Sequence, residues 1–156
     1  MKTLLNVLGV IFACLILLLL ALRITGLEPH DRTPGLWLKG DLVTTPVTDW
    51  SFTDKIPEIK IQTQTPFLLP HSVTIWCAAY NGNLYVTSYR GRQWVENIIR
   101  DPNVRLKIAD KVFDRTLSIV NDPVEKAAVL QAKGRKYPQW KVPSVSAATV
   151  FRVNPA

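Results

Sequence analysis

The stretch HSVTIWCAAYNGNLYVTSYRGRQW, residues 71–94, decides the fold. Residues 73–80 are apolar and mostly β-branched or aromatic, residues 81–83 read Asn-Gly-Asn, and residues 84–88 resume the strand pattern. Asn-Gly between two such runs is a strong hairpin signal, because both residues tolerate a positive φ. The stretch therefore predicts a β-hairpin, then a basic turn, then the start of a helix.

The chain beyond this stretch predicts a second hairpin and two short helices. The first helix carries Trp94, Val95, Ile98 and Ile99 on one face and ends at Asp101-Pro102. Residues 104–108 and 113–119 alternate apolar and polar side chains around a turn at 109–110, as paired half-buried strands do.

The second helix has its own start and stop signals. Asp122 is the expected N-cap, Pro123 takes the first helical position, and Glu125 closes a capping box. Its expected buried stripe is Val124, Ala127, Ala128 and Leu130, and Gly134 is the expected stop.

Further strands are expected at residues 59–63 and 147–153, with a weaker one at 41–45. Five to seven short antiparallel strands with two short helices form a barrel or a sandwich, because one open sheet would leave its apolar faces and edges uncovered. The fold class is therefore mainly β.

The N-terminal residues predict a membrane helix. Residues 4–22 carry no charge, and a helix of this length spans close to the roughly 30 Å hydrocarbon core. A cleaved signal peptide is the competing interpretation, but only Lys2 precedes the run and residues 21–23 offer no small-x-small cleavage site. We expect a single-pass membrane protein that contacts lipid through residues 4–22, with its domain on the non-cytoplasmic side because the tail before the helix is very short.

The rest of the chain divides by composition. Residues 1–24 form the anchor, residues 25–58 are a proline-rich tether with peripheral strands, and residues 59–156 form the main domain. The net charge of +7 is segregated, with −2 over residues 28–85 and +7 over residues 86–156. The basic residues are scattered along strands without interleaved aromatics, so no nucleic-acid partner is expected, whereas contact of this half with anionic lipid stays open.

Several classes of site are excluded by residue type. With two histidines, and with Cys77 as the single thiol outside the apolar run, no metal site is expected. The P-loop, GxGxxG and GxSxG motifs are absent. His71 is interpreted as a strand-end residue with a satisfied hydrogen bond, and no catalytic residue is assigned.

The turn at residues 88–92 is the candidate binding site. It sets the Ser88 hydroxyl and the guanidinium groups of Arg90 and Arg92 where a strand meets a helix, and Gly91 lets a ligand approach closely. Backbone N–H groups at a helix start and arginine forks both favour an anion such as phosphate. The alternative is that both arginines solvate an exposed turn.

Residues 84–104 resemble the central block of the flavin-binding split-barrel superfamily: a strand ending in Thr or Ser, a basic turn, a short helix, Asp-Pro and another strand. In pyridoxamine phosphate oxidases the corresponding turn contacts the flavin phosphate. The spacing from Trp94 through Asn97 to Asp101-Pro102 is similar to that of deazaflavin-dependent nitroreductases. The resemblance spans roughly residues 59–153 and implies a split β-barrel, usually dimeric, behind one transmembrane helix.

By this resemblance, Ser88, Arg90, Gly91, Arg92 and Trp94 would bind FMN or a deazaflavin. The first hypothesis is a membrane-anchored oxidoreductase that acts on a small electron-poor substrate such as a quinone or nitro compound. The oxidases' upstream strand carries an Arg and a Lys that residues 71–76 lack. Their C-terminal substrate-binding Arg and His pattern is also missing, which argues against pyridoxal phosphate synthesis. The alternative is therefore a non-enzymatic, membrane-tethered binding module that has lost tight cofactor binding.

Overall fold

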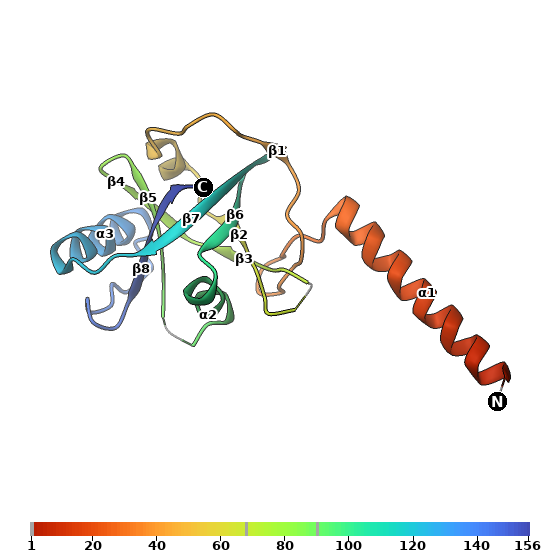
Figure 1. Cartoon of the computed structure of the whole chain (residues 1–156). Coiled ribbons are helices and arrows are strands. Elements are labelled where there is room, and N and C mark those ends of the chain that lie inside the picture. The colour runs from red at the N-terminus through yellow and green to blue at the C-terminus, as the bar shows by residue number, and fades with distance from the viewer. Residues whose placement is uncertain (1, 68, 90) are drawn as a thin grey trace.

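A computed structural model of the chain describes residues 2–67, 69–89 and 91–156. One long helix, α1 (Lys2–Thr25), extends away from a β-rich body, and two shorter helices, α2 (Gln93–Arg100) and α3 (Pro123–Lys136), lie against that body (Figure 1). A 3₁₀ turn, η1 (Ser51–Lys55), packs on the β-rich body as well.

Eight strands form one sheet. They are β1 (Asp41–Leu42), β2 (Ile59–Thr63), β3 (His71–Ile75), β4 (Cys77–Tyr80), β5 (Asn83–Ser88), β6 (Asn103–Ile108), β7 (Lys111–Ile119) and β8 (Thr149–Pro155). The order across the sheet is β3-β2-β6-β7-β8-β5-β4, all antiparallel, and β1 pairs in parallel with the start of β7. Mainly β structure with two short helices and one long apolar helix confirms the predicted fold class.

The two end strands of this order, β3 and β4, are one continuous piece of chain. Trp76 alone separates them, and at that residue the chain leaves its partner β2 and takes β5 instead. The sheet therefore curls until its first and last strands, β3 and β4, meet at Trp76. This meeting closes the sheet into a barrel at Trp76, but the described residues of β3 and β5 do not pair with each other, so the barrel is open between them.

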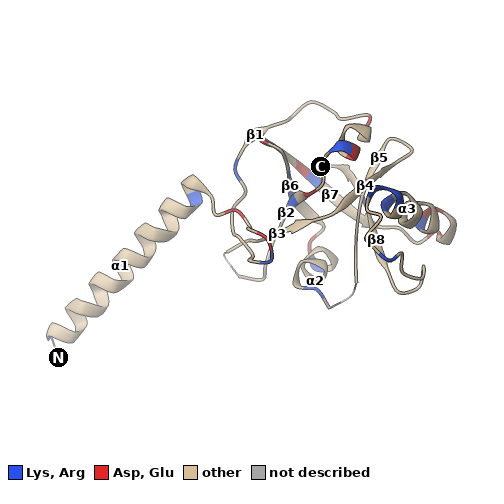
Figure 2. Ribbon diagram, turned by 180° about the vertical axis from the view of Figure 1, so that it is seen from behind, with Lys and Arg blue, Asp and Glu red and all other residues tan. Residues whose placement is uncertain are grey.

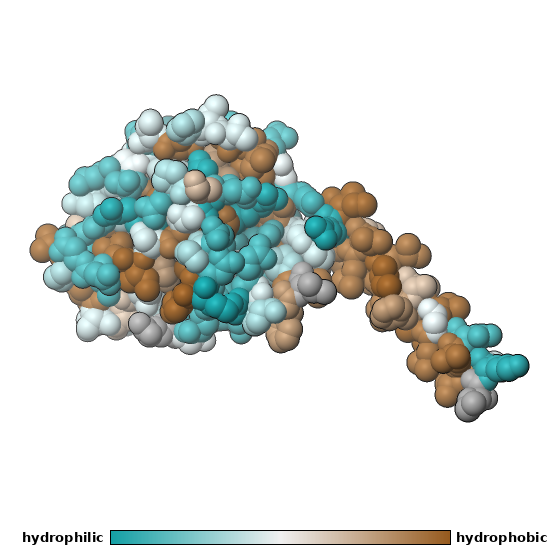
Figure 3. Space-filling model, viewed as in Figure 1, coloured by the Kyte–Doolittle hydropathy of each residue, from teal (hydrophilic) through white to brown (hydrophobic). Residues whose placement is uncertain are grey.

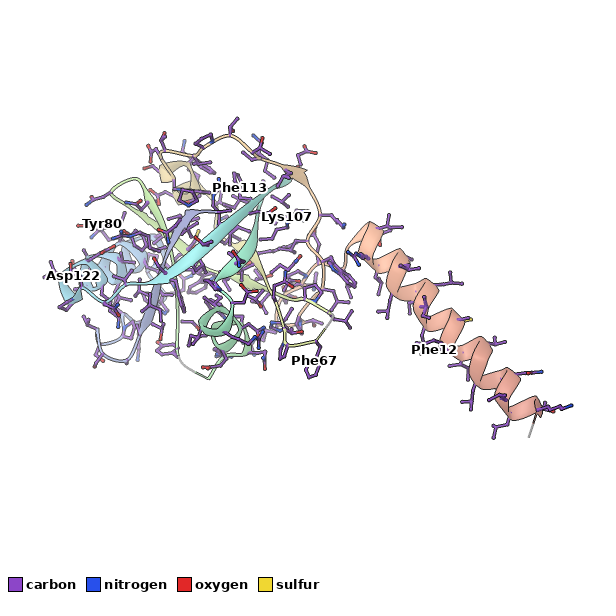
Figure 4. The ribbon with its side chains drawn as sticks, in the orientation of Figure 1. Phe12, Phe67, Tyr80, Lys107, Phe113 and Asp122 are labelled. Atoms are coloured by element: carbon purple, nitrogen blue, oxygen red, sulfur yellow. The ribbon has the colours of Figure 1, made fainter. Side chains whose placement is uncertain are left out.

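Alternating side chains of the strands fill the barrel. In β6, Val104, Leu106 and Ile108 are buried while the residues between them are partly exposed. Phe113 of β7 points into the same core (Figure 4). Trp50, from the segment before β2, packs its ring 5.3 Å from that of Phe113, so the predicted tether contributes to the core.

Most local signals are confirmed, with some corrections. The predicted strand over residues 73–80 is wrong as a single hairpin strand, because the chain changes partners at Trp76. In α2, Ile99 is 45% exposed and the polar Asn97 takes the buried place, where its amide donates to Thr63 Oγ1 at 3.0 Å. The strand expected at residues 41–45 is only the two residues of β1.

Helix α3 begins as predicted but continues further. Asp122 caps it by accepting hydrogen bonds from the backbone N–H groups of Val124 and Glu125. Glu125 does not close a capping box, because its carboxylate binds the Tyr85 hydroxyl and the Arg152 guanidinium. The helix passes through Gly134 to Lys136. Its buried residues are Val129, Leu130 and Lys133, and the expected stripe member Val124 is exposed.

Helix α1 is long and apolar enough to cross a membrane, with a mean hydropathy of 2.9 and none of its residues buried. Apolar surface covers most of its visible length, with hydrophilic surface near its N-terminal end, and side chains such as Phe12 project sideways from the helix without touching the barrel (Figures 3 and 4). The chain after α1 is tied to the sheet by Glu28, whose carboxylate accepts hydrogen bonds from Lys60 of β2 and Lys107 of β6.

Candidate functional site

The candidate site is an open cleft of about 1360 Å³ where the barrel is not closed. One wall is β3 with Trp76, and the opposite wall is Thr87 and Ser88 of β5 with the start of α2. Among the strands of the described residues, β3 pairs with β2, and its other edge forms one isolated bridge between Ser72 and Gly35. At Thr87 and Ser88, β5 pairs with β8. The cleft therefore lies between two strand edges that the fold leaves without a strand partner.

Three of the predicted binding residues line this cleft. Ser88 is the last residue of β5, Arg92 is the N-cap residue of α2, and Trp94 follows in the first turn. Ser88 is half-buried and Arg92 is exposed, whereas Trp94 is only 7% exposed and packs toward Phe151 in the core. A hydroxyl and a guanidinium thus share one cleft with the edge of a buried indole.

The other two predicted residues are placed differently. Gly91 adopts a φ of +83°, its backbone N–H donates to Glu96 Oε1 at 3.1 Å, and a side chain at this position would meet open space. That conformation favours glycine and leaves the turn open to close approach. Arg90 lies outside the described residues. Tyr89, which follows Ser88, is exposed and does not line the cleft.

A residue that sequence reasoning missed, Lys133 of α3, also reaches the cleft. It is 4% exposed, and its ammonium donates a hydrogen bond to Thr87 Oγ1 at 2.5 Å. The ammonium lies over the ring of Trp140 at 4.4 Å and over that of Trp76 at 5.9 Å. Burial lowers the pKa of Lys133 to about 8.

The sequence carried a signal for Lys133. It stands four residues after Val129 and three after Leu130, on the face of α3 that packs on the sheet. A lysine at a position where the helical periodicity places buried residues is unusual, because lysines are almost never fully buried. Figure 2 shows the basic positions on α3 beside β4 and β8.

Trp76 is held in the cleft wall by Tyr137. The two rings are stacked with centroids 4.5 Å apart and planes 5° from parallel. The Tyr137 hydroxyl donates to the Pro57 carbonyl at 2.7 Å and lies 3.4 Å from the backbone N–H of Cys77. Burial raises the pKa of Tyr137 far above its ordinary value, so the phenol stays protonated.

His71 does not have the satisfied side chain expected for it. It lines the cleft at the start of β3, and its buried Nδ1 has no hydrogen-bond partner in the part of the chain that the structure describes. Burial lowers the pKa of His71, which favours the neutral imidazole. The remaining wall of β3 presents Val73, Thr74 and Ile75, with no cation.

No family model matches the chain, and no curated protein matches it. Solved structures do. A conserved hypothetical protein, Rv2991, from Mycobacterium tuberculosis is similar with a TM-score of 0.58 and 19% identity, over 76% of this chain and 85% of that one. A proposed 5-nitroimidazole antibiotic resistance protein from Bacteroides thetaiotaomicron has a TM-score of 0.55 and 16% identity, over 81% and 89%.

A third similar structure is an F420 reductase, with a TM-score of 0.54 and 22% identity, over 72% of this chain and 96% of that one. All three identities are low, so the likeness concerns the fold. Together with the sheet order and the break at Trp76, these structures establish that the chain has the split-barrel fold that the resemblance of residues 84–104 predicted.

Proposed function

We propose that the protein binds FMN or a deazaflavin in the cleft between β3 and β5 and acts as a membrane-anchored oxidoreductase on a small electron-poor compound, such as a quinone or a nitro compound. The observation that carries the proposal is the gathering of Ser88, Arg92 and Trp94 around one cleft. The F420 reductase and the proposed nitroimidazole resistance protein share this fold, which supports a redox function.

The residues in the cleft suit a phosphorylated ring system. A serine hydroxyl and an arginine fork are the donors that phosphate oxygens prefer, and the open turn at Gly91 gives them room. The cleft exceeds the range of about 300–1,000 Å³ typical of small-molecule sites, so its size admits both a cofactor and a small substrate. The flavin or deazaflavin would supply hydride transfer when bound, and the protein would bind and orient it.

Two further parts of the proposal rest on other features. The length and hydropathy of α1 support its role as a lipid-embedded anchor, with the barrel on the non-cytoplasmic side. The open side of the cleft supports a homodimer in which the second copy covers it, as the split-barrel resemblance implies. The division into an anchor over residues 1–24, a tether over residues 25–58 and a barrel over residues 59–156 remains part of this proposal.

The test is cofactor binding by the full chain in detergent. FMN and F420 are titrated separately and followed by their visible absorbance. We expect micromolar or tighter binding of one of them. We also expect Ser88→Ala and Arg92→Gln each to weaken it by about 10- to 100-fold, the loss for one charge-assisted hydrogen bond. Arg135→Gln, which removes an exposed arginine of α3 outside the cleft, is the matched control and should bind like the parent protein.

Failure of both cofactors to bind at micromolar concentration would remove the enzyme proposal. So would binding that Arg92→Gln leaves unchanged, because the phosphate would then lie elsewhere. Reduced cofactor, loaded without oxygen and mixed with menadione, tests the chemistry. Reoxidation on the protein, with a hydride and a proton passing to the quinone to give the hydroquinone, is the expected result.

The wall formed by β3 favours a second candidate function. Val73, Thr74 and Ile75 face the cleft without the basic residues that the upstream strand of the oxidases carries. A non-enzymatic module, tethered to the membrane and binding a small ligand without tight cofactor retention, fits that wall. Under this alternative, small molecules bind in the cleft, but menadione is not reduced at any cofactor concentration.

A further inference from the structure

Lys133 is the one lysine that the described part of the cleft contains. It belongs to α3 and bonds Thr87 of β5, whereas Arg92 begins α2. The described part of the cleft therefore has three cationic side chains, Lys133 of α3, Arg92 at the start of α2 and Arg32 of the segment before β1, and the phosphate-binding proposal uses only Arg92.

The surroundings of the Lys133 ammonium leave it open to a ligand. An ammonium has three N–H donors. Within the described residues, the Thr87 hydroxyl is its one hydrogen-bond acceptor, and the rings of Trp76 and Trp140 lie beside it, with Cys77 and Lys136 also nearby. An indole face attracts a cation but does not replace a hydrogen-bonding oxygen.

A nearly buried ammonium with one oxygen partner is costly unless something compensates for its lost hydration. The described residues place no carboxylate within ion-pair distance of it. The compensating anion is missing at a place where the Lys133 side chain reaches a ligand-sized cavity, with the Trp76 indole in the cavity wall and the Trp140 ring beside the ammonium.

We propose that Lys133, with Thr87, Trp76 and Trp140, forms a binding subsite for an aromatic or conjugated ligand that carries an anionic oxygen, such as a carboxylate or a phenolate. The inference rests on the proposed function only in taking this cleft as the ligand site, and it narrows the ligand class to electron-poor aromatics with an acidic group. The ring contacts the indoles, and the anionic oxygen accepts hydrogen bonds from the ammonium.

The test compares 4-nitrobenzoate with 4-nitrobenzamide, two ligands of nearly equal shape that differ in charge. Binding to the full chain in detergent is followed by quenching of tryptophan fluorescence at pH 7, without added cofactor. The expected result is a preference for the carboxylate of about 10-fold or more. Lys133→Met should abolish the preference, Lys133→Arg should retain it, and Arg135→Gln should not change it.

The preference should also fall as the pH rises from 7 to 9. The ammonium loses its proton around pH 8, while the benzoate stays ionised throughout. Other ionisable groups near the subsite are Lys136 and Cys77. The same cleft is lined by further ionisable residues: Asp31, Arg32, Glu58, His71 and Arg92. The Lys133→Arg variant keeps its charge at pH 9, so its preference for the carboxylate ligand should not fall as the pH rises. This variant therefore distinguishes titration of Lys133 from titration of the other groups.

Equal affinities for the two compounds, or a carboxylate preference that survives in Lys133→Met, would overturn the inference. Circular dichroism of each variant checks that it is folded. A repeat titration with saturating FMN identifies the natural occupant. An unchanged affinity assigns the subsite to the substrate, and loss of binding assigns it to the ring of the cofactor. If neither FMN nor F420 binds but the carboxylate preference holds, the cofactor proposal fails and the subsite stands.

Discussion

Replacing Tyr137 by phenylalanine removes one oxygen atom from the support of the cleft wall and leaves the ring in place. That oxygen links the Pro57 carbonyl, before β2, to the backbone of Cys77 in β4. Tyr137 is 5% exposed, and Cys77 is fully buried. The variant therefore leaves the buried N–H of Cys77 without this contact, while the more exposed Pro57 carbonyl can turn to water.

The expected loss is about 1–2 kcal/mol in the free energy of unfolding, at the lower end of the range for a buried group left without its partner. For a domain of this size that loss lowers the melting temperature by roughly 2–8 °C. Because the phenol stays protonated well above neutral pH, the loss should be the same at pH 6 and pH 9. Tyr137→Ala should cost about 3–5 kcal/mol, since it also removes the ring that stacks on Trp76.

The assay is urea unfolding of the full chain in detergent, followed by circular dichroism. Tyr80→Phe is the matched control, because the described residues offer the half-buried Tyr80 hydroxyl no hydrogen-bond partner. It should change stability by less than about 0.5 kcal/mol. The reasoning is refuted if Tyr137→Phe costs as little as the control, since the oxygen would then not connect the two segments.

Three other variants probe separate layers of the structure. Leu106→Ala, at a fully buried core position of β6, should cost about 2–5 kcal/mol in urea unfolding, and a loss below 1 kcal/mol would show that the core can collapse around the cavity. Asp122→Ala removes the N-cap of α3 and should cost about 0.5–2 kcal/mol, with the exposed Asp110→Ala as the control that stays near zero. Partial burial opposes ionisation of Glu28, but hydrogen bonds from Lys107 and Lys60 outweigh it and lower the pKa of Glu28. The ionised Glu28 carboxylate therefore stabilises the fold above about pH 4.5, and this stabilisation is lost as the pH falls through the pKa of Glu28 in the folded protein. In the Glu28→Gln variant, the free energy of unfolding should therefore decrease less between about pH 5 and pH 3 than in the parent protein. Identical acid profiles for Glu28→Gln and the parent would contradict that pairing.

Local chemistry made much of the fold predictable from the sequence. Asn81 and Gly82 adopt φ values of 49° and 75°, as a tight hairpin turn requires, and Asp122 caps α3 as its side-chain type favours. The partner change at Trp76 could not be predicted in this way. Residues 71–80 contain no turn signal that would mark the change, which depends on where β2 and β5 lie in the closed sheet.

The candidate site was predictable only in part, for a related reason. The turn at residues 88–92 is contiguous in sequence, so its hydroxyl and charges could be recognised as a group. Lys133 lies some 40 residues further along, and its place beside Thr87 depends on the packing of α3 against β4 and β5. Only its position on the buried face of α3 distinguished it from the exposed basic residues around it.

At Trp76 the two end strands of the sheet, β3 and β4, follow each other directly within residues 71–80. The position of β3, one wall of the cleft, relative to β4 therefore depends on the backbone torsions at that one residue and on the ring stacked upon it. Adding one residue there would reverse the inward and outward sides of β3 relative to β4, so the mouth of the cleft tolerates changes of side chain far better than changes of chain length.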